Sequence, residues 1–159
     1  MRFPRISRDT ARVLPVDADG RVLLQLGREL HRRSDRFWLT IGGGTKRGES
    51  LAAAGAREMR EEAGIEVDPA LLGAPIGVTV IEYNLFTLLP VIQRQTYFAV
   101  AVDDAEVSPA HQSLLERLSI ERHEWLTADE LERRPERVVD AELPRLVRAA
   151  VAAVRPRTA

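Results

Sequence analysis

The sequence predicts an α/β fold in which a mixed β-sheet lies between helices. Apolar runs typical of strands occur both before and after a central helical pattern, and a second amphipathic helical pattern closes the chain. A sheet with helices before and after its strands is expected to be covered on both faces. The 159 residues, 45% of them apolar, suffice for one packed core, so we expect a single domain over residues 1–159.

The first elements are predicted to form a β-hairpin. Residues 12–16 are a short apolar run, and Pro15 within it predicts a position at a sheet edge or a bulge, because proline cannot donate to the ladder. A turn at residues 17–20 leads into a second apolar run at residues 21–26.

The centre of the chain is predicted to run from a strand through a glycine loop into a helix. The short apolar strand over residues 37–41 is expected to end abruptly at three consecutive glycines, residues 42–44. Ser50 is a suitable N-cap for a helix that starts at Leu51, and Gly64 is a suitable C-cap for its end.

The second half of the chain is expected to alternate strands with short helices. Strands are predicted at residues 76–82 and 96–102 and around residues 123–126, with a polar loop over residues 103–119. A short helix over residues 128–133 would be capped by Thr127, with Glu130 at its third position as in a capping box. The last helix is expected to start near Asp140 and to tolerate Pro144 in its first turn.

The composition excludes several function classes. Lys and Arg number 23 against 24 Asp and Glu, and a net charge of −1 argues against a nonspecific nucleic-acid binder or a membrane-surface protein. Because cysteine is absent, any metal must be held by oxygen atoms or by the three histidines. No apolar run approaches the roughly 20 residues that span a bilayer, and we expect a cytoplasmic protein.

The predicted central helix carries three glutamates in barely more than one turn. Glu58 and Glu62 are four residues apart and share a face, and like charges at that spacing destabilise a helix. A divalent cation such as Mg²⁺ or Mn²⁺ would offset that cost, because hard cations prefer carboxylate oxygens. The alternative is a solvated helix face whose charge is partly neutralised by Arg57 and Arg60. The glycines before the helix favour a cradle for metal-bound phosphates, because they let the backbone approach a ligand closely.

Residues 43–65 closely resemble the signature of the Nudix hydrolases, G-x5-E-x7-R-E-U-x-E-E-x-G-U, in which U is a bulky aliphatic residue. The chain has Ile41 where the family usually has a proline before the glycine pair, a change that alters the rigidity of the loop and removes no ligand. The seven fixed and two apolar positions of the signature are all present without an insertion: Gly43, Glu49, Arg57, Glu58, Met59, Glu61, Glu62, Gly64 and Ile65.

The resemblance implies a Nudix-like α/β/α sandwich that hydrolyses a nucleoside diphosphate linked to another group, with Mg²⁺ as cofactor and Mn²⁺ as a substitute. It implies that Glu58 and Glu62 bind the metal directly. Glu61 would be a further ligand or the residue that orients or deprotonates water. The backbone carbonyl of Gly42 would complete the metal shell, and Arg57 would hold Glu58 and Glu49 in place.

Many family members take the general base, or one more ligand, from a glutamate in the loop before a late strand. Glu116 is the candidate here and Glu121 the second choice, and the alternative for Glu116 is an exposed loop acid. Glu61, Glu62 and Glu116 therefore all remain candidates for the general base. The histidines His111 and His123 are expected to be surface or turn residues rather than ligands.

The substrate is a small nucleotide whose identity the sequence leaves open among ADP-ribose, (d)NTPs and dinucleoside polyphosphates. Candidate substrate contacts are Gly43, Gly44, Lys46, Glu49 and Tyr83. The alternative function is a Nudix-fold nucleotide sensor that binds without cleaving, although such sensors typically lose one of the signature glutamates. The apolar C-terminal helix is expected to pack within the chain, and a homodimer through that helix is the alternative.

Overall fold

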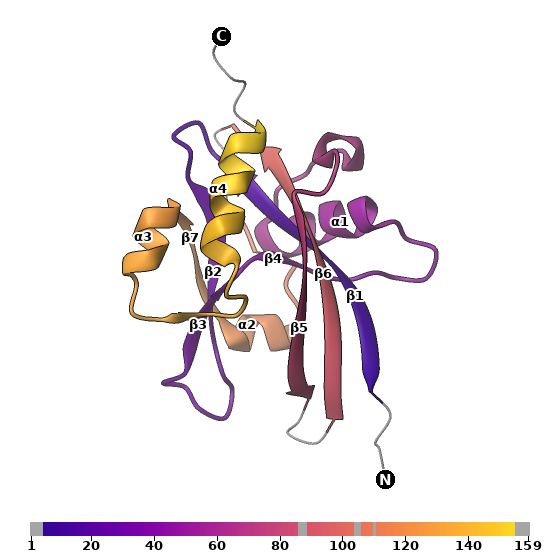
Figure 1. Cartoon of the computed structure of the whole chain (residues 1–159), viewed down its shortest axis with the longest axis vertical. Helices are drawn as coiled ribbons and strands as arrows, with labels where there is room; N and C mark the ends of the chain where they lie inside the picture. The colour runs from indigo at the N-terminus through magenta and orange to yellow at the C-terminus, as the bar shows by residue number, and fades with distance from the viewer. Residues whose placement is uncertain (1–4, 86–88, 104–105, 110, 155–159) are drawn as a thin grey trace.

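The structure is a computed structural model that describes residues 5–85, 89–103, 106–109 and 111–154. Its one sheet has the strand order β5-β6-β1-β2-β3-β8, with β4 paired to β1 and β7 paired to β2 (Figure 1). The strands are β1 (Ile6–Val16), β2 (Val22–Arg28), β3 (Arg36–Leu39), β4 (Ile41–Gly44), β5 (Gly77–Leu85), β6 (Leu89–Ala101), β7 (Ile120–Leu126) and β8 (Arg137–Val138). The helices are α1 (Leu51–Ala63), α2 (Leu114–Ser119), α3 (Ala128–Arg133) and α4 (Leu143–Val154), with a 3-10 turn at Pro69–Leu72.

The sheet is mixed, as predicted. β1 runs parallel to β6 over its whole length and antiparallel to β2 and β4. Of the two positions predicted for Pro15, a sheet edge or a bulge, the edge is wrong, because β1 is an interior strand with β6 on one side. Pro15 lies where β1 changes partner on its other side: pairing with β4 reaches Val13, and pairing with β2 begins at Val16. A missing N–H is tolerated at that break in the ladder.

The predicted hairpin forms only at its turn. Asp17 accepts from the Gly20 N–H (3.1 Å), and Val16 pairs with Val22. Beyond that pair the two strands separate: β1 continues beside β4, and β2 continues beside β3 and β7. The sheet therefore opens between β1 and β2.

The two faces of the sheet carry separate cores, which confirms the predicted sandwich. Along β6, Tyr97 and Ala99 face α3 and α4, whereas Phe98 and Val100 face α1. Figure 1 shows α4 in front of the sheet and α1 behind it. The buried residues of α4 pack on the sheet of their own chain: Leu143, Leu146, Val147 and Ala150.

Local capping signals account for most of the helices. Ser50 accepts from the Ala53 N–H at the start of α1, Gly64 ends α1 in the left-handed conformation, and Thr127 forms the predicted capping box at α3. The loop expected over residues 103–119 was wrong at its end, because α2 begins after Ser113 with a second capping box. α4 starts at Leu143, three residues later than expected, after a turn in which Asp140 accepts from the Glu142 N–H.

Candidate active site

The glycines that precede α1 are part of a strand, which corrects the predicted loop. Residues 42–44 of β4 pair with residues 10–12 of β1. An ideal Cβ on Gly42, whose φ is +146°, would lie 2.1 Å from the Ala11 carbonyl oxygen. A Cβ on Gly43 would lie 2.5 Å from Glu58 Oε1. These glycines bring the backbone against both a neighbouring strand and the helix carboxylate.

Three carboxylates converge beside β4. Glu58 and Glu62 project from α1 and are only 7% and 6% exposed, and Glu116 projects from α2. One oxygen of each of the three carboxylates lies within 4.8 Å of the others. The residues predicted as direct ligands are therefore brought together with the residue predicted from the later loop.

Glu116 is held by the helix that carries it. Its Oε2 accepts from the Ser113 N–H at 2.7 Å, and its own N–H donates to Ser113 Oγ at 3.3 Å. It is thus a partly buried capping residue, and the alternative of an exposed loop acid is wrong. Glu121, the second choice, is paired with Arg36 at 2.7 Å instead.

Arg57 joins the remaining acids of the signature. Its five hydrogen bonds go to Glu49 (two, both 2.9 Å), Glu58 (2.9 Å), Glu61 (3.2 Å) and the Gly44 carbonyl (3.0 Å). The guanidinium has five N–H groups, so its donor capacity is fully used. This contact set agrees with the expectation that Arg57 holds Glu58 and Glu49.

The pKa values of the clustered glutamates shift in opposite directions. Hydrogen bonding to Arg57 lowers the pKa of Glu49 to about 2. Burial raises the pKa of Glu58 although Arg57 acts against it, and burial with the nearby charges of Glu58 and Glu116 raises the pKa of Glu62 to about 8. The pKa is therefore raised for the two acids that are buried, Glu58 and Glu62, and lowered for Glu49, which Arg57 pairs through two hydrogen bonds.

Glu62 is fixed by groups from two strands. Its Oε2 accepts from the Gly42 N–H at 3.0 Å and from Gln25 Nε2 at 3.4 Å. The Gly42 carbonyl, predicted as a metal ligand, accepts from Arg12 Nη1 at 3.1 Å. Arg12 also donates to the Thr40 carbonyl at 3.2 Å and so braces β4 on both sides of Ile41.

The other predicted substrate contacts are divided between two places. The Lys46 N–H donates to Glu49 Oε1 at 3.0 Å, which places this turn beside the cluster. Tyr83 on β5 donates to Gln93 Oε1 at 3.3 Å. Gln93 in turn donates to Gln95, and Gln95 donates to the hydroxyl of Tyr97, on the face of the sheet that α4 covers. The structure therefore does not bring Tyr83 to the carboxylates.

Sequence reasoning missed Arg12, Gln25 and His123. Gln25 is a polar residue in the apolar strand β2, a signal for a buried hydrogen bond, and it is 1% exposed. His123 was expected at the surface or in a turn, yet it lies half-buried on strand β7, and burial lowers its pKa. His111 is exposed in a turn, as expected.

The donor set fits a divalent cation. Carboxylates supply only oxygen, the atom that Mg²⁺ and Mn²⁺ prefer. Two of the three are buried, and burying like charges together is costly without a positive partner. Glu61 is not one of the three converging carboxylates. Its side chain is about one-third exposed (32%) and pairs with Arg57.

A family model described as "NUDIX domain" matches residues 6–147. The chain belongs to the Nudix family. Nudix membership implies a hydrolase that acts on nucleoside diphosphates linked to another group. No curated protein sequence matches the chain at a significant level.

Solved Nudix structures share the fold. A MutT protein from Methanosarcina mazei superposes with a TM-score of 0.61 at 20% identity, covering 97% of this chain and 100% of its own. A Nudix hydrolase from Nitrosomonas europaea gives 0.60 at 16%, covering 94% and 91%. An Ap4A hydrolase from C. elegans superposes with a TM-score of 0.58 at 16% identity, covering 92% of this chain and 96% of its own.

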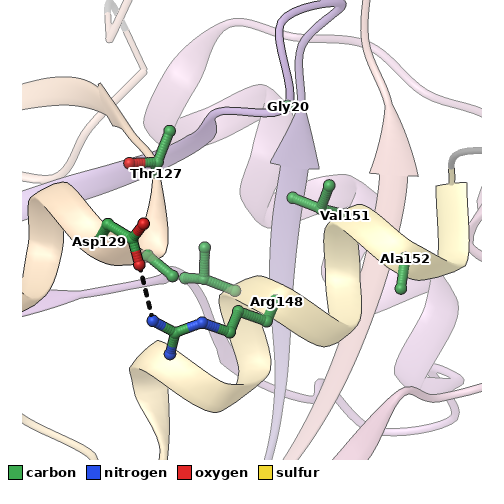
Figure 2. Close-up of a pocket in the computed structure, with 8 residues that line it drawn as sticks. Gly20, Thr127, Asp129, Arg148, Val151 and Ala152 are labelled. Carbon is green, nitrogen blue, oxygen red and sulfur yellow. Dashed lines mark hydrogen bonds and ion pairs between the residues drawn. The ribbon is translucent and has the colours of Figure 1, made fainter.

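A pocket of about 330 Å³ between α3 and α4 lies away from this site. Figure 2 shows Arg148 reaching across it to Asp129, at 2.9 Å. α3 and α4 cover the face of the sheet opposite to α1, so this pocket does not contribute to the carboxylate cluster. Among the described residues, none of the helices combines the length and apolar character needed to cross a bilayer.

Proposed function

We propose that the chain hydrolyses the pyrophosphate bond of a nucleoside diphosphate linked to another moiety, with Mg²⁺, or Mn²⁺ in its place, held by Glu58, Glu62 and Glu116. The observation that carries the proposal is the convergence of three carboxylates, two of them buried, from α1 and α2. A bound cation would neutralise charge on the phosphate oxygens and favour ionisation of the attacking water. We further propose that the protein acts in the cytoplasm.

The other residues of the cluster have separate roles in this proposal. Arg57 orients Glu58 and Glu49, because its guanidinium bridges both carboxylates and the Gly44 carbonyl. Glu61 is more exposed than Glu58 and Glu62, and we assign it the task of orienting or deprotonating water, which requires only hydrogen-bond reach. Gly43 lets the Glu58 carboxylate lie against the β4 backbone, because any side chain at this position would meet that carboxylate.

Gly44 and Lys46 lie on the same approach to α1, and Lys46 adds a positive charge for a phosphate. The substrate classes that this site accommodates by chemistry are (d)NTPs, ADP-ribose and dinucleoside polyphosphates. All three present a negatively charged pyrophosphate to the carboxylate cluster, and they differ in the group attached beyond it.

Product release over a panel of these three classes, with Mg²⁺ and again with Mn²⁺, tests the proposal. We expect one class to stand above the others and Glu62→Gln to lower its turnover by about 10³-fold, equivalent to several kcal/mol of charge stabilisation. The matched control is Glu66→Gln, an exposed glutamate four residues further on, which should retain the wild-type rate. A folded Glu62→Gln variant with an undiminished rate would contradict the site assignment.

A further inference from the structure

Gln25 is a buried amide that the proposed chemistry does not use. It lies on β2 with its side chain toward α1, whereas its neighbours Leu24 and Leu26 belong to the core under α3 and α4. Its exposure is 1%, and a buried amide is costly unless it is hydrogen-bonded. The partners of this amide therefore indicate why the strand tolerates it.

The partners of Gln25 determine its orientation. Its Nε2 lies 3.4 Å from Glu62 Oε2 and 3.2 Å from His123 Nε2. A carboxylate oxygen accepts, so the amide must present its nitrogen rather than its oxygen to Glu62. The same NH₂ group has a second hydrogen for His123, whose Nε2 then accepts and whose ring hydrogen is on Nδ1.

We propose that Gln25 and His123 are positioning residues that hold the Glu62 carboxylate in the orientation it needs to bind the cation. This inference rests on the proposed function. Gln25 and the Gly42 N–H both donate to Glu62 Oε2, so groups from two strands, β2 and β4, restrain the carboxylate. His123 fixes which way the amide faces, and its ring also interacts with the Glu62 backbone.

Such outer contacts have measurable consequences for metal binding. A ligand that is already oriented loses less rotational freedom when the ion binds, and removing its outer hydrogen-bond partner typically costs 10- to 100-fold in metal affinity. Glu58 has Arg57 as its partner and Glu116 has Ser113. Gln25 completes the set by giving the third carboxylate a side-chain donor.

The test is the Mn²⁺ dissociation constant of the full chain without nucleotide, measured by electron paramagnetic resonance. Gln25→Met keeps the length of the side chain and removes the donor, and we expect Mn²⁺ to bind about 10- to 100-fold more weakly. The half-saturating Mn²⁺ concentration for hydrolysis should rise by the same factor, while the rate at saturating Mn²⁺ falls less. The control Leu23→Val, on the same face of β2, should lower the melting temperature and leave Mn²⁺ affinity unchanged.

His123 supplies a second variant, which tests whether Gln25 and His123 act together on Glu62. We expect His123→Leu to weaken Mn²⁺ binding less than Gln25→Met, and the loss of affinity in the double variant to be smaller than the sum of the two single losses. Additive losses, or wild-type Mn²⁺ affinity in folded Gln25→Met, would overturn the inference while leaving the proposed function standing. A wild-type chain that neither binds Mn²⁺ nor hydrolyses any nucleotide of the panel would overturn both.

Discussion

The two faces of the sheet each bury carboxylate, and they do so in opposite ways. On the α4 face one carboxylate is buried among the described residues, that of Asp140, which is 6% exposed. It accepts from Tyr97, Gln95 and Thr79 through Oδ2 and from the Glu142 N–H through Oδ1. On the α1 face three carboxylates share one small volume. On the α4 face four donors serve one carboxylate, whereas on the α1 face four donors are shared among three carboxylates: the Gly42 N–H, Gln25, Arg57 and the Ser113 N–H.

This difference separates a structural role from a functional one. Asp140 has its charge distributed over four hydrogen bonds and ties the start of α4 to β5 and β6. Glu62 has two donors, of which one is a long contact, and two negative neighbours. A buried acid whose partners are incomplete is costly to the fold, and such a cost is typical of a site that gains its missing partner on binding.

The largest expected effect on the structural side comes from removing Asp140. Asp140→Ala should lower the free energy of unfolding by about 3 kcal/mol, because buried donors on Tyr97, Thr79 and Gln95 lose their shared acceptor. Urea denaturation measures this difference. The control Asp129→Ala removes an aspartate that is 73% exposed and should cost less than about 0.5 kcal/mol. Equal losses in the two variants would break the comparison.

Among the residues that position others, Arg57 should have the largest effect on activity when its guanidinium is replaced. Arg57→Lys keeps the charge but cannot bridge Glu49, Glu58 and the Gly44 carbonyl together. We expect kcat to fall by about 10²-fold, the usual result of misplacing reacting groups by about 1 Å. Arg60→Lys, an exposed arginine on the same helix, should leave kcat unchanged. A fully active Arg57→Lys enzyme would show that charge alone suffices.

The smallest expected effect concerns acid stability and Glu49. Because the folded pKa of Glu49 is about 2, below the usual 4.5, the unfolded chain binds more protons between these values. The stabilisation is therefore complete above pH 4.5 and is lost as the pH falls toward 2. Between pH 5 and pH 3 the melting temperature of the wild type should fall further than that of Glu49→Gln. If the melting temperatures of the two proteins fell equally with pH, the Arg57–Glu49 pair would contribute no acid-sensitive stability.

The parts of the site that sequence predicts are those encoded locally. The caps of α1 and the four-residue spacing of Glu58 and Glu62 depend on neighbours in the chain, and both were predicted. The pairing of Glu62 with Gln25 and of Gln25 with His123 joins strands far apart in sequence, so no local pattern reports it. The strand formed by residues 42–44 was also missed, because glycines enter β4 only when β1 pairs with them.

Other local signals were present and not used. Ser113 and Glu116 have the spacing of a capping box, the same pattern that predicted α3, and they would have placed Glu116 on a helix. Pro15 was assigned to an edge or a bulge because the sequence of a single strand does not reveal that its partner changes from β4 to β2. The family signature contains two of the three carboxylates that converge, Glu58 and Glu62, whereas Glu116 lies outside it and the Glu61 of the signature pairs with Arg57 instead.

The most direct test of the central claim is the melting temperature of the wild type and of Glu62→Gln, each with and without Mn²⁺. The account predicts that above about pH 8, where the buried Glu62 is ionised, metal-free Glu62→Gln is more stable than the wild type by about 0.5–2 kcal/mol, because a buried like charge is removed. It predicts that Mn²⁺ raises the melting temperature of the wild type and leaves that of Glu62→Gln nearly unchanged. A less stable metal-free variant, or an equal Mn²⁺ response in both proteins, would contradict the claim that these carboxylates form a cation site.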